Sequence, residues 1–176
     1  MELGLRGNEV KIVPYSQKWR DEFLKVKKEI HQHTKLEENR IEHMGSTAVE
    51  GMQAKPIIDI LVGVDDLTVL DPSIADGLKA IGFYRLRVDR PGEIVCAKFK
   101  DDTYEEKTHF IHLVEYREEL WENLLFFRDY LIAHEEAREK YTDLKLDYLE
   151  KSSTGINDYT NHKEAFVKSI FTKRNI

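Results

Sequence analysis

The segment GSTAVEGMQAKPIIDILVGV, residues 45–64, places a Gly-Ser turn ahead of an apolar run that contains one carboxylate, Asp59. Successive side chains of an extended strand point to opposite faces, so Ile58 and Ile60 would share an apolar face and Asp59 would project from the other. An ionised carboxylate inside such a strand is costly unless it is paired, hydrogen-bonded or bound to a cation. The segment therefore predicts a strand at residues 57–64 with one charged group that needs a partner.

Two interpretations of Asp59 follow from these residues. In the structural one, Asp59 forms a salt bridge with Lys55 or with an arginine from the C-terminal half. In the functional one, Gly45 and Ser46 form a tight turn whose backbone N–H groups face a phosphate, with the Thr47 hydroxyl as a further donor. Asp59 would then hold a divalent metal beside that phosphate. Such a pair of sites suits phosphoryl chemistry, although Gly-Ser-Thr is also ordinary turn composition.

Composition indicates an ordered protein, and we expect one domain over residues 1–176. The net charge is −6, from 27 basic and 33 acidic residues spread along the chain, so a nucleic-acid partner is not expected. The single cysteine, Cys96, cannot form an internal disulfide and is expected to be a packed apolar residue. No apolar run approaches the ~20 residues that cross a bilayer, and the N-terminus lacks a signal-peptide core, so we expect a cytoplasmic protein without membrane spans.

Periodicity predicts a mixed sheet between two groups of helices. Helical spacing of apolar residues predicts helices from Ser16 to residue 33, over 73–81, on both sides of a break near His134, and after a loop at 152–155. The fold class is α+β, or α/β in looser usage, with packed helices and a C-terminal helical half. Alternating or β-rich runs predict strands at 10–13, 39–44, 57–64, 83–88, 94–99 and 109–115.

Three stretches resemble the GrpB-like family: IEHMGSTAVEGMQAKPIIDILV (41–62), THFIHLVE (108–115) and LLFFRDYLIAHEEAREKYTDLK (124–145). The resemblance runs through most of the chain. By fold, that family is placed in the DNA polymerase β-like nucleotidyltransferase superfamily, and some relatives carry the module fused to a dephospho-coenzyme A kinase. The resemblance therefore implies a nucleotidyltransferase fold, whereas activity has to be argued from the site, because one fold hosts catalytic and non-catalytic members.

The superfamily pattern has Gly-Ser after a strand and, about a dozen residues on, two acidic residues flanking an apolar one. Gly45, Ser46 and Asp59 match this pattern, but Leu61 stands at the second acidic position. The usual pair of metal-binding carboxylates on this strand is thus reduced to one. We therefore expect slow or absent nucleotidyl transfer.

A later strand supplies a third carboxylate in the superfamily, and the resemblance places His112 at that position. On a strand, His112 would face Asp59 while His109 and Glu115 point to the other side. A His/Asp pair suits zinc or manganese better than a magnesium-only site. The alternatives are that His112 is a neutral proton acceptor or a hydrogen-bonding core residue.

Two further cations are candidate phosphate ligands. Lys55 lies just before the strand, and its ammonium would either touch phosphate or balance Asp59. Arg128 lies at the edge of an apolar helical stripe, where it would bind phosphate or form an ion pair with Asp129 or another carboxylate.

The sequence thus predicts a nucleotidyltransferase-fold protein that binds a nucleotide or another phosphorylated small molecule, with a divalent metal (Mg, Mn or Zn). The alternative is a non-catalytic ligand-binding or interaction module, for which Leu61 is the best evidence, or an accessory to coenzyme A metabolism. The predicted catalytic and metal-binding residues are Asp59 and His112, and the predicted phosphate-binding residues are Gly45, Ser46, Thr47, Lys55 and Arg128.

Overall fold

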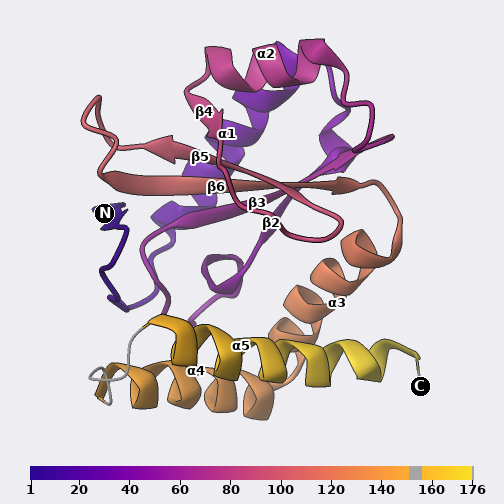
Figure 1. Ribbon diagram of the computed structural model, residues 1–176. Helices are drawn as coiled ribbons and strands as arrows, with labels where there is room; N and C mark the ends of the chain where they lie inside the picture. The colour runs from indigo at the N-terminus through magenta and orange to yellow at the C-terminus, as the bar shows by residue number, and fades with distance from the viewer. Residues whose placement is uncertain (151–155, 176) are drawn as a thin grey trace.

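A mixed six-stranded sheet forms the centre of the molecule in the computed structural model, which describes residues 1–150 and 156–175, with the backbone course alone for 156–161 (Figure 1). The strand order is β2-β3-β6-β5-β4, and β1 pairs with β6. The β3–β6 pair is parallel and the other pairs are antiparallel, so the predicted α+β class and mixed sheet are confirmed. The strands are β1 (Leu5–Arg6), β2 (Ile41–Met44), β3 (Ile58–Val64), β4 (Phe83–Arg85), β5 (Ile94–Phe99) and β6 (Glu106–Glu115).

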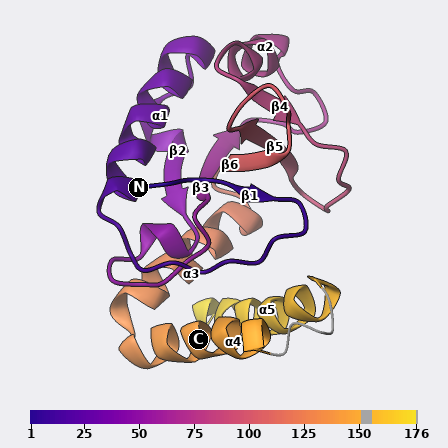
Figure 2. The ribbon, with the colours of Figure 1, turned by 90° about the vertical axis from the view of Figure 1, so that its left-hand side faces the viewer.

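Helices lie on both sides of this sheet. Helices α1 and α2 lie above it, whereas α3 leaves the end of β6 and leads to α4 and α5 on the opposite side (Figures 1 and 2). No helix in residues 1–150 or 156–175 is long and apolar enough to cross a membrane. The helices are α1 (Lys18–Thr34), α2 (Pro72–Ala80), α3 (Glu119–Ala133), α4 (Glu135–Glu150) and α5 (Ile156–Phe171), with short 3-10 turns η1 (Glu38–Arg40), η2 (Ser46–Ala48) and η3 (Thr172–Asn175).

The face of the sheet toward α1 and α2 is the main apolar core. As the alternation predicts, Ile58, Ile60 and Val62 are fully buried there, together with Trp19 and Val26 from α1. Each fully buried side chain of this kind contributes roughly 1.5–3 kcal/mol to folding. The core therefore fixes β3 as a central strand, with Asp59 on its other face.

The opposite face is closed at one end by the start of α3. Leu61 is buried there against Val114 and Trp121. A Cβ at Gly63 would lie 2.7 Å from the Tyr116 ring and 3.1 Å from Trp121, so only glycine permits this approach. The sheet and α3 are therefore in direct contact beside Leu61, and Asp59 lies nearer the other end of the strand.

The connection between β2 and β3 packs against the C-terminal helices. Val49 and Met52, both in this connection, are buried with Phe127, Leu131 and Tyr141 from α3 and α4. The chain therefore leaves the sheet after β2, packs against the helices and returns to the sheet at β3. This path brings the Gly-Ser turn against α4.

Most predicted elements are confirmed, although the strand predicted at 83–88 ends at Arg85, the one predicted at 39–44 begins at Ile41, and the N-terminal segment differs further. The predicted strand at 10–13 is wrong, because only Val13 pairs, in an isolated bridge to Ala54, while Leu5–Arg6 forms the strand β1. Pro14 has no N–H and cannot extend that bridge. Ser16 does not cap α1: the cap position is Gln17, without a side-chain hydrogen bond. The predicted loop at 152–155 lies outside the described residues.

Candidate functional site

The Gly-Ser turn lies directly against the Asp59 carboxylate. Met44, the last residue of β2, is the cross-strand partner of Asp59, and Gly45 then turns the chain with φ of 73°. A Cβ at Gly45 would lie 2.8 Å from Asp59 Oδ2. Both the positive φ and the close approach favour glycine. The predicted proximity of the turn and the carboxylate is therefore present in the fold.

His112 lies between two carboxylates. Its Nε2 is 3.3 Å from Asp59 Oδ1, and its Nδ1 is 3.6 Å from Glu93 Oε1. The sheet produces this arrangement, because His112 pairs with Leu61 on β3 and with Val95 on β5, so its two neighbours in the sheet carry Asp59 and Glu93 two residues upstream. A carboxylate only accepts hydrogen bonds, so Nε2 of His112 is the donor to Asp59, while Glu93 lies at ion-pair distance from Nδ1.

The pKa values of this group follow from burial and charge. Burial alone would lower the pKa of His112, but Asp59 and Glu93 outweigh burial and raise it to about 9. For Asp59, burial raises the pKa, and the hydrogen bond from His112 with the charges of Lys163 and Lys55 lowers it below its usual range. The Asp59 side chain is 32% exposed and that of His112 is 12% exposed, so solvent or a ligand reaches the carboxylate more readily than the ring.

Lys145 from α4 binds the other side of the turn. Its Nζ donates to Ser46 Oγ at 2.8 Å and to the Gln53 carbonyl oxygen at 3.0 Å, and the residue is only 2% exposed. Burial, then the positive charges of Lys163 and Lys55, lower the pKa of Lys145 to about 7. Both hydrogen-bond partners that Lys145 has among the described residues are neutral. With this pKa the buried amine is only partly protonated near pH 7, and its contacts among the described side chains are these two hydrogen bonds and the Tyr141 ring, 4.5 Å from Nζ, with no carboxylate among them.

Lys55 and Lys163 complete a group of three lysines. Burial and the charge of Lys163 lower the pKa of Lys55 to about 8, against the opposing influence of Asp59. The three lysines come from the β2–β3 connection, α4 and α5, which places them far apart in the sequence and near one another in the fold. Tyr141, also on α4, contacts Lys145, whose Nζ lies 4.5 Å from the centre of the Tyr141 ring. The turn therefore faces a cationic surface made by the helical half.

The Thr47 side chain points toward His43. It is 3% exposed, and its Oγ1 lies 2.9 Å from Nε2 of His43, whose ring stacks on Phe23 of α1 at 4.7 Å. Burial lowers the pKa of His43 to about 4, so this imidazole is neutral near pH 7. The structure does not bring the Thr47 hydroxyl together with Ser46 Oγ, and His43 orients the turn from the core side. The phosphate role predicted for Thr47 stays a prediction.

Arg128 is held by ion pairs. Its Nη1 donates to Glu42 Oε2 at 2.8 Å and to the His43 carbonyl oxygen at 3.0 Å, and its Nε donates to Asp129 Oδ1 at 2.9 Å. This is the geometry of the ion-pair interpretation, and it fastens α3 to β2. The structure brings Gly45, Ser46 and Asp59 into one site, and the phosphate role of Arg128 stays a prediction.

The predicted site residues did not include Glu93 or Lys145. Glu93 lies between the predicted strands at 83–88 and 94–99 and directly precedes the buried strand that begins at Ile94. Lys145 lies four residues after Tyr141 and three before Tyr148, and all three are buried. A lysine on the apolar stripe of a helix was the signal that could have identified it.

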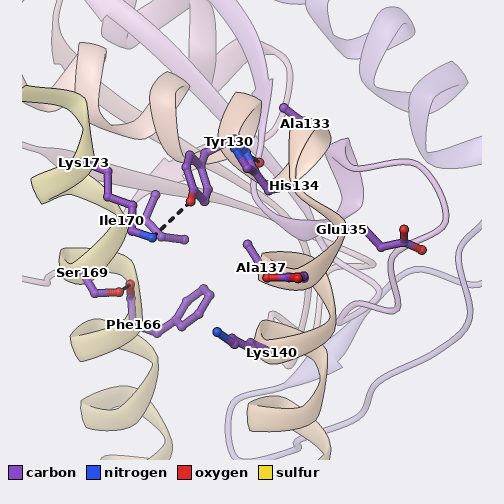
Figure 3. A pocket seen from close by; sticks show the side chains of 11 residues that line it. Tyr130, Ala133, His134, Glu135, Ala137, Lys140, Phe166, Ser169, Ile170 and Lys173 are labelled. Carbon is purple, nitrogen blue, oxygen red and sulfur yellow. Dashed lines mark hydrogen bonds between the residues drawn. The ribbon is translucent and has the colours of Figure 1, made fainter. Parts of the chain in front are cut away.

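Two pockets lie away from this site. The larger, of about 520 Å³, is formed by the end of α3, the start of α4 and the end of α5, where His134 stacks on Tyr130 and Lys173 Nζ donates to the Tyr130 hydroxyl at 3.1 Å (Figure 3). The other, of about 340 Å³, lies between α2 and the β4–β5 hairpin, beside Cys96. Neither is lined by Asp59, His112 or the three lysines.

The amino-acid sequence is similar to those of known proteins. The profile of the family described as GrpB protein matches residues 9–173. The chain is 39% identical to the glutamate-rich protein GrpB of Alkalihalophilus pseudofirmus, over 97% of this chain and 99% of that protein. It is 28% identical to a dephospho-CoA kinase of Mycobacterium bovis, over 93% of this chain and 45% of that protein.

Solved structures are also similar to this chain. The crystal structure of the conserved protein GrpB from Enterococcus faecalis is similar with a TM-score of 0.74 and 26% identity, over 93% of this chain and 96% of that chain. A mutant of the Cid1 poly(U) polymerase bound to MgATP is similar with a TM-score of 0.52 and 15% identity, over 81% of this chain and 46% of that chain. At that identity the likeness shows the fold alone, and the fold is nucleotidyltransferase-like.

Proposed function

Because this chain belongs to the GrpB family and has a nucleotidyltransferase-like fold, we propose that it binds a phosphorylated small molecule, foremost a nucleotide, at the Gly45–Ser46 turn. The observation that carries the proposal is Lys145, a buried amine that donates to Ser46 Oγ, is easily protonated near pH 7 and has no carboxylate partner among the described residues. Burying a charge is costly unless it is paired. An anionic phosphate at the turn would supply the missing partner.

The other lysines favour a ligand with several negative charges. Lys55 and Lys163 both act electrostatically on Lys145, and repulsion among like charges raises the free energy of the unliganded site. A polyphosphate that contacts all three ammonium groups would turn this repulsion into attraction. Lysine binds phosphate as a point charge, and perturbed pKa values are common at functional sites.

Binding is proposed here without rapid nucleotidyl transfer. Leu61, at the second acidic position of the superfamily pattern, is 0% exposed and packed against Val114 and Trp121. A buried apolar side chain at this position cannot hold a metal or stabilise developing charge. The non-catalytic alternative of a ligand-binding module therefore has a specific observation in its favour, and it shares the same anion site.

A thermal-shift screen tests the proposal. Nucleoside mono-, di- and triphosphates and coenzyme A precursors are added to the protein with and without magnesium, manganese or zinc. A ligand at 100 times its Kd adds ~2.7 kcal/mol, and in a domain of this size each kcal/mol raises the Tm by roughly 2–4 °C, so we expect a rise of about 5–10 °C. A folded protein whose Tm no phosphorylated compound changes would contradict the proposal.

Helix α5 offers a matched pair of variants for locating the ligand. Lys163→Gln removes a cation that acts on Lys145, whereas Lys168→Gln removes one that is 70% exposed and paired with Glu164 on the same helix. We expect the first variant, like Ser46→Ala, to reduce the ligand-induced shift, and the second to leave it unchanged. Equal effects of the two lysine substitutions would show a general charge effect and not a site at the turn.

A further inference from the structure

The Ser46 hydroxyl and the Lys145 amine form a direct pair at the Gly-Ser turn. Ser46 Oγ lies 2.8 Å from Lys145 Nζ, and a second hydrogen bond of 3.0 Å, to the Gln53 carbonyl oxygen, fixes the amine. Ser46 is only half-buried, so molecules in solution reach it, whereas Lys145 is 2% exposed. An accessible hydroxyl within hydrogen-bonding distance of a buried amine is the arrangement of a nucleophile and its base.

The surroundings of Lys145 favour the neutral amine. Burial and the positive charges of Lys163 and Lys55 lower its pKa to about 7, so a large fraction of the amine has a free lone pair near neutral pH. In that form the Ser46 hydroxyl donates its hydrogen to Nζ across the same 2.8 Å, and the amine still donates to Gln53. The geometry is then set for transfer of the Ser46 proton.

The turn also holds Ser46 in a fixed position. Gly45 turns the chain sharply with φ of 73° just before it. Thr47, just after it, is 3% exposed, and its Oγ1 lies 2.9 Å from Nε2 of His43 in the core. A reacting group that is held in place reacts faster than one that moves freely.

We propose that Ser46 is a nucleophile with Lys145 as its general base, and that the pair accepts an acyl group from a neutral ester or thioester. This inference goes beyond the proposed function and does not depend on it. The charge of the site selects the electrophile, because an anionic phosphate beside Lys145 stabilises the protonated amine, which has no lone pair. A neutral carbonyl compound leaves the amine free to take a proton. Serine–lysine pairs are a recurring variant of the Ser-His-Asp arrangement.

The reaction has two steps. Ser46 Oγ forms a bond to the carbonyl carbon, and Lys145 Nζ takes the hydroxyl proton. The positive charges of Lys55 and Lys163 stabilise the negative charge that develops on the carbonyl oxygen. The bond from carbon to the leaving oxygen or sulfur then breaks, and the alcohol or thiol leaves with the proton from Nζ. Water hydrolyses the Ser46 ester in the same way, which gives the carboxylic acid and free Ser46.

A fluorophosphonate, which reacts with activated serine hydroxyls by loss of fluoride, tests this on the full chain. We expect one phosphonate adduct by intact-protein mass spectrometry, placed on Ser46 by peptide mass spectrometry. Ser46→Ala should abolish the adduct. Ser169→Ala, which removes an exposed hydroxyl of α5 that donates to the Phe166 carbonyl oxygen, should retain it. A folded wild-type protein without an adduct on Ser46, or with equal labelling of other hydroxyls, overturns the inference.

The pH dependence of labelling tests the role of Lys145. Arginine keeps the charge and the donors but does not lose its proton, so we expect Lys145→Arg to lower the rate by about 10²–10⁴-fold and to remove a rise with pH whose midpoint is near pH 7 in the wild type. The other titratable groups around the amine are Lys55 of the β2–β3 connection, Lys163 of α5 and Tyr141 of α4, on which Asp59 of β3 acts.

Lys55→Gln separates these groups. Because it removes a positive neighbour of Lys145, it should keep the rise and move its midpoint to higher pH. Loss of the rise in Lys55→Gln, or an unchanged rise in Lys145→Arg, overturns the assignment of Lys145 as the base.

Inorganic pyrophosphate distinguishes this inference from the proposed function. A thermal shift with pyrophosphate but no adduct on Ser46 overturns the nucleophile and leaves the proposed function standing. An adduct on Ser46 in a protein whose Tm no phosphorylated compound changes does the reverse. Where both occur, saturating pyrophosphate should slow labelling at least tenfold, because the anion occupies the turn and keeps Lys145 protonated.

Discussion

The two faces of the sheet place the same residue type in opposite charge states. On the face toward α1 and α2, burial lowers the pKa of both His43 and His109 to about 4, even though His109 Nε2 lies 3.1 Å from Glu22 Oε1. On the other face, the pKa of His112 is raised to about 9. Burial determines the histidine pKa where the ring meets at most one partly exposed carboxylate. The negative charges determine the pKa where the ring lies between two carboxylates.

This contrast distinguishes two chemical environments within one sheet. The α1 and α2 side buries apolar side chains and neutral imidazoles, which stabilise the fold. The side toward α3, α4 and α5 holds Asp59, His112 and Lys145 as charged or easily charged groups. Charged groups are kept at such a cost where they bind something, and the following predictions test whether the two faces differ in this way.

The largest effect on stability is expected when a carboxylate replaces Leu61, at the second acidic position of the superfamily pattern. Leu61→Asp places an acid at a fully buried position against Val114 and Trp121, so we expect a loss of about 4 kcal/mol or more in the free energy of unfolding. Urea denaturation measures it, with Leu61→Met as a volume-conserving control expected to cost less than about 1.5 kcal/mol. A stable Leu61→Asp protein that binds magnesium would show that the position is open to a metal ligand.

The next effect concerns His112 and depends on pH. Its folded pKa of about 9 is above the ordinary value of 6.5, so its stabilisation is fully present below pH 6.5 and is lost as the pH rises through about 9. At 1.36 kcal/mol per pKa unit, His112→Gln should cost about 3 kcal/mol near pH 6 and close to nothing from this source above pH 10. Denaturation curves of both proteins across this range provide the measurement.

His109→Gln is the matched control on the other face. His109 has a lowered pKa and is neutral near pH 7, so the cost of replacing it should change little between pH 7 and pH 10. If the loss of stability decreased with rising pH by the same amount in both variants, the two faces of the sheet would not differ as proposed.

A smaller effect tests the contact between the turn and Asp59. Gly45→Ala must adopt φ of 73° and also place a Cβ 2.8 Å from Asp59 Oδ2, whereas Gly51→Ala at φ of 78° meets no atom within 4 Å. The positive φ strains alanine in both variants, and at Gly45 a ψ of −174° also places the residue in a region that is essentially restricted to glycine. We expect Gly45→Ala to lose more stability than Gly51→Ala and to lose pyrophosphate binding. Equal losses would mean that the turn can move away from Asp59.

The sequence predicted the parts of this site that depend on local pattern. Alternation along residues 57–64 placed Asp59 opposite the apolar core, and helical spacing predicted the stripe of α4 that carries Tyr141. The partner of Asp59 depends on the parallel pairing of β3 with β6, which joins distant segments, and His112 was identified through the family resemblance. Long-range pairing of this kind leaves no local signal in the residues themselves.

Three further details depend on tertiary contacts. Thr47 follows Ser46 directly, and the short turn η2 directs it to His43 in the core. Lys145 has the residue type of a solvated helix face, and only the packing of α4 against the Gly-Ser turn buries it. The sequence left both a phosphate and a carboxylate open as partners of Arg128, with the ion pair slightly favoured, and the approach of α3 to Glu42 is a tertiary contact.

The most direct test of the account is a crystal structure of the protein grown with pyrophosphate. We predict density for the anion at the turn, within hydrogen-bonding distance of Ser46 Oγ and Lys145 Nζ, with His112 still between Asp59 and Glu93. Pyrophosphate bound elsewhere, such as in the pocket beside Tyr130 and Lys173, or an unaltered Lys145 that remains closed onto Ser46 at saturating ligand, would contradict it.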